Sequence, residues 1–493
     1  MTAQQFMWAA EGSTDKASEG IAIGIDAAGN SYFSGAFDGI LTLGDTTLVS
    51  YTVGNASRNF FVSRYDMAGN FIWAKQGTGS VNDNSMNIAV DDMGNHYFTG
   101  RIGDQDSVMF GDTTLYNNGI EDKHFVAKCS YNGNFLYARS FGSRDMGGKS
   151  AISSSTYDIE NDTNGDFYVT GEFGNGVNNW TIGDSVFSTS NSAEDIFLAK
   201  FNMDGDFLWA LRSFGDDENE GYGLAIDNAG NVFVVGSIEG TGTLGNVVFN
   251  STANTRDIFV AKFGSNGNLI WFRQFGGPET DEGYGIALDD IGDVYITGEF
   301  QGTINVNGSI ITASGAGTDE GWIAKYDSNG NFIWIRQFGG VMSESVWSIS
   351  SNQFNICVAG SFGGTATFGD TTITSSGDFD AFIAKYDLDG NFISVVGMGG
   401  SDYDEVREAV LDDENNAYLT GFYRATADIG DTTFTTLAFE DTFIAKFGND
   451  AVLLAPVVPT LSEWAVMILG LVMIIMGALA VRPVMKSHSS KAN

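Results

Sequence analysis

The sequence predicts an all-β fold, a seven-bladed propeller of four-stranded blades closed by its N-terminal strand, plus one C-terminal transmembrane helix. Three observations predict this. One phrase returns along the chain, broken copies of it stand at both ends of the repeat region, and an uncharged apolar run follows. The predicted organisation is a propeller over residues 1–449, a linker with a short motif over 450–463, a helix over 464–481 and a basic tail over 482–493.

The repeated phrase reads WIAKYDSNGNFIWIRQFGG at residues 322–340, and three of its landmarks each occur seven times at a period of roughly 60 to 72 residues. The gap from the Lys slot to the Trp slot is always 9 residues, whereas the gap from the Gly slot to the next Lys slot varies from 25 to 29. Constant gaps indicate hairpins whose turns fix the register, and the variable gap indicates a surface loop. The landmarks are a Lys slot (Arg64, Lys128, Lys200, Lys262, Lys325, Lys385, Lys446), a Gly slot (Gly35, Gly100, Gly171, Gly236, Gly298, Gly360, Gly421) and a Trp slot (Trp8, Trp73, Tyr137, Trp209, Trp271, Trp334, Ser394).

One repeat unit predicts four strands, which we name a to d and place in the fifth unit at 283–289, 294–300, 322–327 and 332–338. Strands c and d are joined by Asp-x-x-Gly-Asn, in which Asp327 can accept backbone N–H groups and Gly330 supplies a left-handed residue. Phrases such as LTLGDTTL and ATFGDTTI, between strands b and c, favour a short extra ribbon.

The broken copies decide the architecture. The chain begins with a lone strand d around Trp8 and ends its last unit at strand c, around Lys446. A repeated four-stranded sheet is typical of a β-propeller, and a β-helix would need a much shorter coil. We therefore expect residues 6–10 to pair with residues 443–446 and to close the ring, leaving no exposed sheet edge.

Composition limits the function classes. With 24 basic and 62 acidic side chains the net charge is −38, so nucleic acid is a poor partner. Three histidines are too few and too scattered for a zinc site or a histidine-based triad. The two cysteines, Cys129 and Cys357, fall in blades on different sides of the ring, so we expect two free thiols rather than a disulfide.

These repeats resemble the bacterial SBBP beta-propeller repeat, with its pattern GN-x-Y-x-TG followed by D-x-F-x-AK-x-D-x-x-GN-x-x-W. The resemblance covers residues 5–449, and the departures at Arg64, Tyr137 and Ser394 are interpreted as decay of a structural consensus, with adapted blades as the alternative. The phrase also resembles the tryptophan-docking motif of quinoprotein propellers, which implies a packing role for Ala, Gly and Trp. It implies no quinone, because the vicinal cysteines and metal cluster of those enzymes are not visible here.

The C-terminal segment PVVPTLSEWAVMILGLVMIIMGALAVRP resembles the IPTL-CTERM protein-sorting tail. The resemblance implies sorting machinery as a partner and a location at the cell surface, with release after tail processing as an alternative. The matching residues, preceded by Val458 where the family usually has Ile, are Pro459, Thr460, Leu461, Ser462, Glu463 and Trp464.

Independently of that resemblance, residues 464–481 are 18 residues without a charge. At about 1.5 Å per residue a helix of this length spans about 27 Å, enough for a bilayer core. Arg482, Lys486 and Lys491 follow, which predicts a membrane anchor with the tail in the cytoplasm and the propeller outside. The alternative is a buried globular helix.

An exported propeller needs an N-terminal signal, yet MTAQQFMW has neither a basic region nor an apolar core. Because Trp8 already belongs to the first strand, we expect the natural start to lie upstream.

Candidate sites are few. The Lys row is expected to be structural, its stems packed between blades and its ammonium groups meeting carboxylates such as Asp289. Acidic turns such as 387–391 resemble partial calcium loops, but none has the carboxylate at a twelfth position that an EF-hand requires, so no cofactor is expected, with calcium as the alternative. The acidic segments DDENEGYG and PETDEGYG gather on one ring face.

The predicted function is a non-catalytic binding or scaffold module at the cell surface or envelope, with a protein or glycan ligand. The alternatives are an enzyme that uses the central channel and a purely structural envelope protein.

Overall fold

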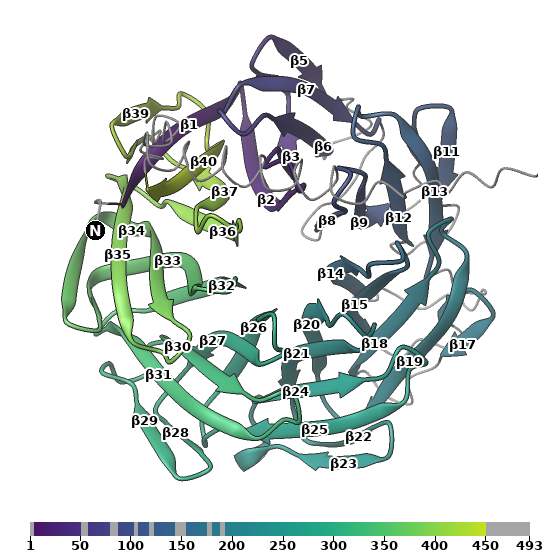
Figure 1. Ribbon diagram of the computed structural model, residues 1–493, viewed down its shortest axis with the longest axis vertical. Helices are drawn as coiled ribbons and strands as arrows, with labels where there is room; N and C mark the ends of the chain where they lie inside the picture. Colours follow the sequence, from purple (N-terminus) through teal and green to yellow (C-terminus); the bar gives the residue numbers. More distant parts are fainter. Residues whose placement is uncertain are drawn as a thin grey trace, which may run out of the picture. The chain divides into compact units, whose positions relative to one another are not determined.

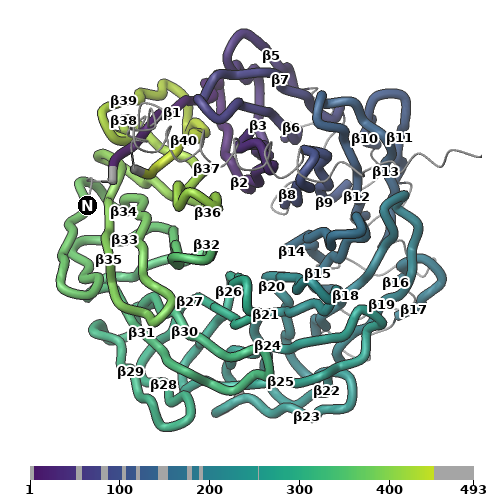
Figure 2. The backbone as a smooth tube through the Cα atoms, in the orientation of Figure 1, coloured from purple at the N-terminus to yellow at the C-terminus, as the bar shows by residue number. Residues whose placement is uncertain are grey.

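The computed structural model describes residues 4–50, 58–78, 87–102, 107–117, 123–142, 154–174, 180–187 and 193–449. All of them belong to one compact unit, Ala3–Asn449. The strands of this unit circle a common centre, and the chain runs once around it (Figures 1 and 2).

Within the described residues, seven sheets of four antiparallel strands form the blades, each with strand a nearest the centre and strand d outermost (Figure 1). Blades 1 to 6 follow one another in sequence, and blade 7 combines the two ends of the ring. The strands, from a to d, are β2 (Ala17–Ile25), β3 (Ser31–Asp38), β6 (Asn59–Tyr65) and β7 (Phe71–Gln76) in blade 1; β8 (Ile88–Val90), β9 (His96–Ile102), β12 (Lys123–Cys129) and β13 (Phe135–Phe141) in blade 2; β14 (Ser154–Asn161), β15 (Phe167–Gly174), β18 (Glu194–Phe201) and β19 (Phe207–Gly215) in blade 3; β20 (Asn219–Ile226), β21 (Val232–Ile238), β24 (Asp257–Phe263) and β25 (Leu269–Phe275) in blade 4; β26 (Asp281–Leu288), β27 (Val294–Phe300), β30 (Glu320–Tyr326) and β31 (Phe332–Gly340) in blade 5; β32 (Glu344–Ser351), β33 (Asn355–Phe368), β34 (Thr371–Asp387) and β35 (Phe392–Gly400) in blade 6; β36 (Glu405–Leu411), β37 (Ala417–Tyr423), β40 (Asp441–Asn449) and β1 (Gln4–Thr14) in blade 7.

Burial follows the position of each strand in its blade. Every residue of β27 and β30 is buried, because strands b and c are covered by a neighbouring blade on each face. Strand d is only partly covered: in β31 Ile333 is exposed and Trp334 is buried. The core is therefore a set of apolar layers between adjacent blades. Strands b and c are buried on both faces, which explains why they contain unbroken runs of apolar residues such as Val, Ile and Phe.

The c–d turn forms as the sequence predicts. The Asp327 carboxylate accepts hydrogen bonds from the backbone N–H of Asn329 (2.9 Å) and of Asn331 (2.8 Å), and Gly330 has φ +76°. The register shifts between Lys325 and Tyr326, so the turn carries a bulge.

The expected ring closure is confirmed. Strand β1 pairs antiparallel with β40, with Ala9 opposite Ala445 and Trp8 opposite Lys446. The Phe6 and Phe447 rings pack with centroids 5.2 Å apart. Strand d of the seventh blade thus comes from the N-terminus, which satisfies the edge of β40.

Tryptophans of strand d link blades 1, 3, 4 and 7 to the blade that follows each of them. Trp271 Nε1 donates to the carbonyl of Ser328 in blade 5 at 3.2 Å, and its ring lies over Gly330, where an added Cβ would come within 2.7 Å of it. Trp8, Trp73 and Trp209 make the same hydrogen bond to the following blade. The packing role implied by the docking-motif resemblance is therefore present.

The departure at Ser394 has a structural cause rather than decay of a consensus. A tryptophan in the Trp slot of blade 6 would dock on the c–d turn of blade 7. That turn does not exist, because strand c of blade 7 ends at Asn449 and its strand d begins at Gln4.

The expected extra ribbons are present between strands b and c. In blades 1, 4, 6 and 7 the ribbon pairs with the end of strand d in the preceding blade, as Gly12 pairs with Leu43. The ribbons add a second link between neighbouring blades. They are β4 (Ile40–Leu43) with β5 (Thr46–Val49), β10 (Ser107–Phe110) with β11 (Thr113–Tyr116), β16 (Trp180–Ile182) with β17 (Ser185–Phe187), β22 (Thr241–Leu244) with β23 (Val247–Asn250), β28 (Thr303–Val306) with β29 (Ser309–Thr312), the facing ends of β33 and β34, and β38 (Thr426–Ile429) with β39 (Thr432–Thr435).

The transmembrane helix predicted at 464–481 requires a correction. In the part of the chain that the structure describes, no helix is long and apolar enough to cross a membrane, and the helical content is the single 3-10 turn Thr252–Asn254. Residues 464–481 lie outside the described residues. The fold class is therefore corrected to all-β for the part of the chain that the structure describes.

Both cysteines are free and buried, as expected. Burial raises the pKa of the Cys129 and Cys357 thiols, which makes them unreactive small hydrophobes.

Candidate binding channel

Strand a of six blades carries a β-bulge at one repeated position, and the bulged side chain faces the central channel. The register shifts by one residue at Ile21, Tyr157, Tyr222, Tyr284, Trp347 and Arg407. All six side chains line one cavity of about 650 Å³. Bulges re-aim a side chain that regular pairing would direct elsewhere, so this ring of residues is a product of the repeat.

Four of these side chains form an arc of rings that contact one another in tilted or edge-on pairs. Ring centroids are 4.8 Å apart for Tyr157 and Tyr222, 5.0 Å for Tyr222 and Tyr284, and 4.8 Å for Tyr284 and Trp347. The Arg407 guanidinium lies over the Trp347 ring at 5.3 Å and ends the series. We call Tyr157, Tyr222, Tyr284 and Trp347 the aromatic arc. It gives one side of the channel an apolar, polarisable wall.

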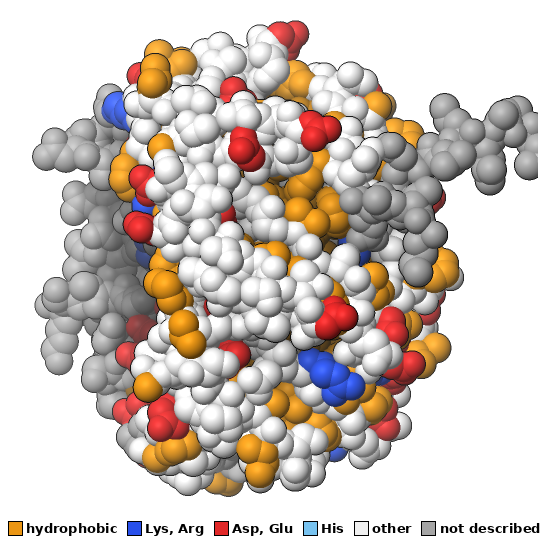
Figure 3. Space-filling model, turned by 90° about the vertical axis from the view of Figure 1, so that its left-hand side faces the viewer, with side chains coloured by type: hydrophobic (Ala, Val, Ile, Leu, Met, Phe, Trp, Pro, Cys, Tyr) orange, Lys and Arg blue, Asp and Glu red, His pale blue; other side chains and the backbone are white. Residues whose placement is uncertain are grey.

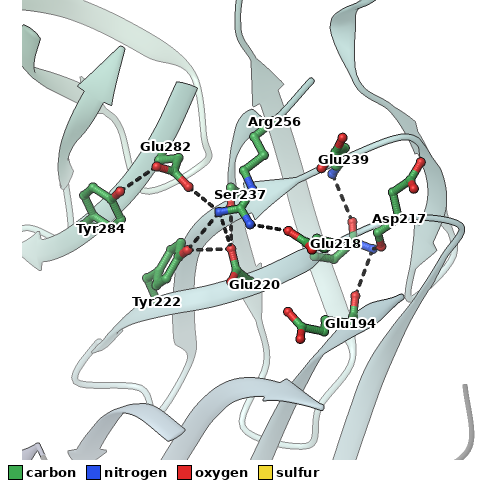
Figure 4. A network of polar contacts seen from close by, with 11 residues as sticks. Glu194, Asp217, Glu218, Glu220, Tyr222, Ser237, Glu239, Arg256, Glu282 and Tyr284 are labelled. Carbon is green, nitrogen blue, oxygen red and sulfur yellow. Dashed lines mark hydrogen bonds and ion pairs between the residues drawn. The ribbon is translucent and has the colours of Figure 1, made fainter. Parts of the chain in front are cut away.

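Carboxylates hold the two central tyrosines of the arc in place (Figure 4). The hydroxyls of Tyr222 and Tyr284 donate to Glu220 (2.5 Å) and Glu282 (2.6 Å), respectively. Arg256 reaches both glutamates, at 2.8 and 2.5 Å, and also Glu218 at 2.5 Å. One guanidinium therefore joins blades 4 and 5 and balances part of a larger negative charge.

At the interface between blades 3 and 4 a glutamate stands at the repeat position that Arg256 occupies in blade 4. Glu194 stands six residues before its Lys slot, as Arg256 does in the next blade, and it lies beside Glu172 and Glu220. One oxygen from each carboxylate falls within 4.8 Å of the other two. Burial, and then the charges of Glu194 and Glu220, raise the pKa of Glu172 to about 9. A shared proton is therefore the expected state of this cluster near neutral pH.

We predict that the protein becomes less stable as pH rises from 7 to 9. Burial raises the pKa of Glu172 and Glu344 to about 9 and of Glu299 to about 8. Each acid has a pKa in the folded state above its pKa in the unfolded state. Its contribution to the free energy of unfolding is therefore complete below the unfolded-state pKa and is lost as pH rises toward the folded-state pKa. The buried His96 and His124, whose pKa values burial lowers, stay neutral over this range.

Thermal unfolding at pH 7, 8 and 9 measures this directly. Glu172→Gln should flatten the pH dependence, and Asp370→Asn, at an exposed ribbon tip, is the matched control. An unfolding temperature that rises with pH would contradict the assignment.

The Lys row has the structural role expected of it. Lys325 Nζ lies 3.8 Å from Asp289 and 2.9 Å from Asp293, and 4.9 Å from the centroid of the Tyr295 ring. Lys200 and Lys446 repeat this arrangement on their own strand-b tyrosines. In blades 3, 4, 5 and 7 the lysine thus ties strand c to the a–b turn of its own blade. Arg64 and Lys128 instead donate to backbone carbonyls of the following blade.

The carboxylates of the acidic turns accept hydrogen bonds from within the same turn. Asp387 accepts hydrogen bonds from the backbone N–H of Asp389 (3.0 Å) and of Asn391 (2.8 Å), and from the Asn391 side chain (2.8 Å). The side-chain and backbone hydrogen bonds of Asn391 lower the pKa of Asp387. This is the hairpin explanation that the sequence favours over a calcium loop.

The sorting motif Pro459–Trp464 lies outside the described residues, so its assignment stays a prediction. Sequence reasoning placed the acidic d–a segments on one ring face, and these supply Glu218, Glu220 and Glu282. It missed the aromatic arc. The sequence signal for the arc is the Gly-Tyr-Gly of residues 221–223 and 283–285, but Tyr157 and Trp347 lie in repeat units without that triplet.

Two family models match the chain: the SBBP beta-propeller repeat over residues 270–299 and the IPTL-CTERM motif over residues 458–483. The chain carries an SBBP repeat and an IPTL-CTERM motif. The SBBP match spans β25, β26 and β27, that is, the docking strand of blade 4 and the inner hairpin of blade 5. Both matches agree with the resemblances seen in the sequence.

Two relatives are similar over part of their own length. The uncharacterized WD repeat-containing protein L264 of Acanthamoeba polyphaga mimivirus is 23% identical over 471 residues, which cover 79% of this chain and 33% of that protein. The regulatory protein FlaEY of Caulobacter vibrioides is 26% identical over 190 residues, which cover 37% of this chain and 20% of FlaEY. The chain thus spans at most a third of these relatives.

Among solved structures, Sqt1 from Chaetomium thermophilum is 9% identical with a TM-score of 0.40, covering 91% of this chain and all of that one. A glucose dehydrogenase is 9% identical with a TM-score of 0.33, covering 66% of this chain and 92% of that one.

Proposed function

We propose that this chain is a non-catalytic binding module of a surface or secreted protein, and that the central channel is its binding site. The observation that carries the proposal is the aromatic arc, which lines a cavity of about 650 Å³ together with a few charged groups. Cavities of this size with an apolar wall and few polar groups are typical of ligand sites. The IPTL-CTERM match supports a surface or secreted location and a sorting machinery as partner.

Catalysis in the channel is the alternative. Among described residues, the nearest approach to a nucleophile–base pair is the His124–Ser154 hydrogen bond of 2.8 Å. The two side chains are 0% and 3% exposed and do not line the cavity, which supports binding over catalysis. Acidic side chains are spread over the side of the ring seen in Figure 3, with basic ones at few places, which supports a partner other than nucleic acid.

A binding screen of the full-length protein against amines, peptides and glycans tests the proposal. Ala287→Trp narrows the channel, and Ile333→Trp on the outer strand β31 is the matched control. We expect at least one ligand class to bind saturably and to lose affinity only in Ala287→Trp. Binding that Ala287→Trp leaves intact, or turnover of the bound ligand, would contradict the proposal.

A further inference from the structure

One charged side chain stands at a level of the channel that is otherwise lined by small or aliphatic side chains. Three residues after the bulge, the six strands carry Gly24, Glu160, Ala225, Ala287, Ser350 and Val410. Glu160 lines the cavity from β14. Within the described residues no ion pair joins its carboxylate to a lysine or arginine.

Two neighbouring acidic side chains, Asp158 and Glu408, are committed to the fold. Asp158 accepts the backbone N–H of Leu224 in blade 4 at 2.6 Å, and Glu408 accepts that of Ile23 in blade 1 at 2.6 Å. Burial raises the pKa of Glu160, and the charges of Asp158 and Glu408 raise it further, so the three acidic groups lie close enough to interact. Each of the two therefore links strands a of adjacent blades, whereas Glu160, among the described residues, accepts a hydrogen bond only from the backbone of its own neighbour Asn161.

The channel offers little positive charge in return. Arg407 is the basic side chain that lines the cavity within the described residues, against Glu19, Asp158, Glu160 and Glu408. Its guanidinium is 2.9 Å from Glu405 and lies over the Trp347 ring. A ligand that enters is therefore favoured if it brings a positive charge.

We propose that the channel binds an organic cation, an alkylammonium or guanidinium group attached to an apolar body. The cationic group meets Glu160, whose carboxyl group releases its proton to solvent as the cation binds, and the apolar body lies against the aromatic arc in the same cavity. A charge-assisted hydrogen bond and contact with aromatic rings act together on such a ligand. The inference rests on the channel being the binding site and names the chemistry that it selects.

Calorimetric titration of the full-length protein tests this with matched probes. Phenethylamine stands for a free amine, Nα-acetyl-arginine amide for a side chain of a peptide, and phenethyl alcohol is the neutral control. We expect at least one cation to bind about tenfold or more tightly than the alcohol, as a charge-assisted hydrogen bond provides. Which cation binds tighter distinguishes a free amine from a peptide side chain.

Glu160→Gln, which keeps size and removes charge, should abolish that preference, and Glu160→Asp should retain part of it. Thermal unfolding of both variants verifies that the ring is intact. Equal affinity for cation and alcohol, or a preference that survives in Glu160→Gln, overturns the cation assignment while leaving the channel as the site. If Ala287→Trp leaves cation binding unchanged, the site lies elsewhere, and both proposals fail.

Discussion

Deleting residues 1–14 is expected to destabilise the ring by at least about 4 kcal/mol and to make it prone to aggregation. The deletion removes the eleven-residue strand β1 and exposes the edge of β40. It also removes the Trp8 contact with Gly69 of blade 1 and the hydrogen bond from the Tyr423 hydroxyl to Glu11 at 2.6 Å. The deletion therefore weakens both blade 7, which loses its outer strand, and the contact between blade 7 and blade 1.

Denaturant unfolding of the truncated and complete chains measures this difference. A synthetic peptide of residues 4–14, added in trans, should restore much of the lost stability, because it can occupy the vacant edge. Deletion of residues 1–3 alone is the control, since it leaves β1 whole. Equal stability of the two truncations would show that β1 does not close the ring.

Gly330→Ala is expected to cost about 3 kcal/mol. Gly330 has φ +76°, and an added Cβ would come within 2.7 Å of the Trp271 ring. The left-handed backbone alone costs an L-residue about 1–2 kcal/mol, and the displaced indole adds the remainder.

Gly292→Ala is the matched control. This glycine has φ +83° in the a–b turn of the same blade, and its added Cβ would meet only the Ser328 Cβ, at 3.6 Å. In chemical unfolding, Gly292→Ala should lower the free energy of unfolding by about 1–2 kcal/mol, which is the cost of a left-handed backbone for an L-residue. Equal losses in both variants would mean that docking of Trp271 on the turn contributes nothing.

Local rules made much of the fold predictable. The Asp-x-x-Gly-Asn turn of residues 327–331 specifies a bulged hairpin by its own hydrogen bonds, and the unpaired strands at the two ends left one way to close a ring. Ser394 shows the limit of consensus reasoning. The absence of a tryptophan at this position in blade 6 is explained by the absence of a c–d turn in blade 7, and comparing single repeat units does not reveal that relation.

The channel was harder to predict for a physical reason. A bulge in strand a is set by how seven strands meet around one centre, so Tyr157 and Trp347 face the cavity without a local motif. The pairing of Arg256 with three glutamates, and its replacement by Glu194 in the preceding blade, arise between blades rather than within one. The apolar run at 464–481 gave hydropathy alone, which did not determine a conformation.

The closed ring around one channel is the claim on which the site and both proposals depend, and a designed cross-link tests it. Ala9 and Ala445 are opposite one another in the β1–β40 pair, and antiparallel partners lie about 4.5–5.5 Å apart at Cα, within reach of a disulfide. In the double variant Ala9→Cys with Ala445→Cys, we expect an intramolecular disulfide under mild oxidation, detected by non-reducing electrophoresis and peptide mapping. The single-cysteine variants are controls, because the native Cys129 and Cys357 are buried. A double variant that stays reduced, or links only between molecules, would contradict closure of the ring by its N-terminal strand.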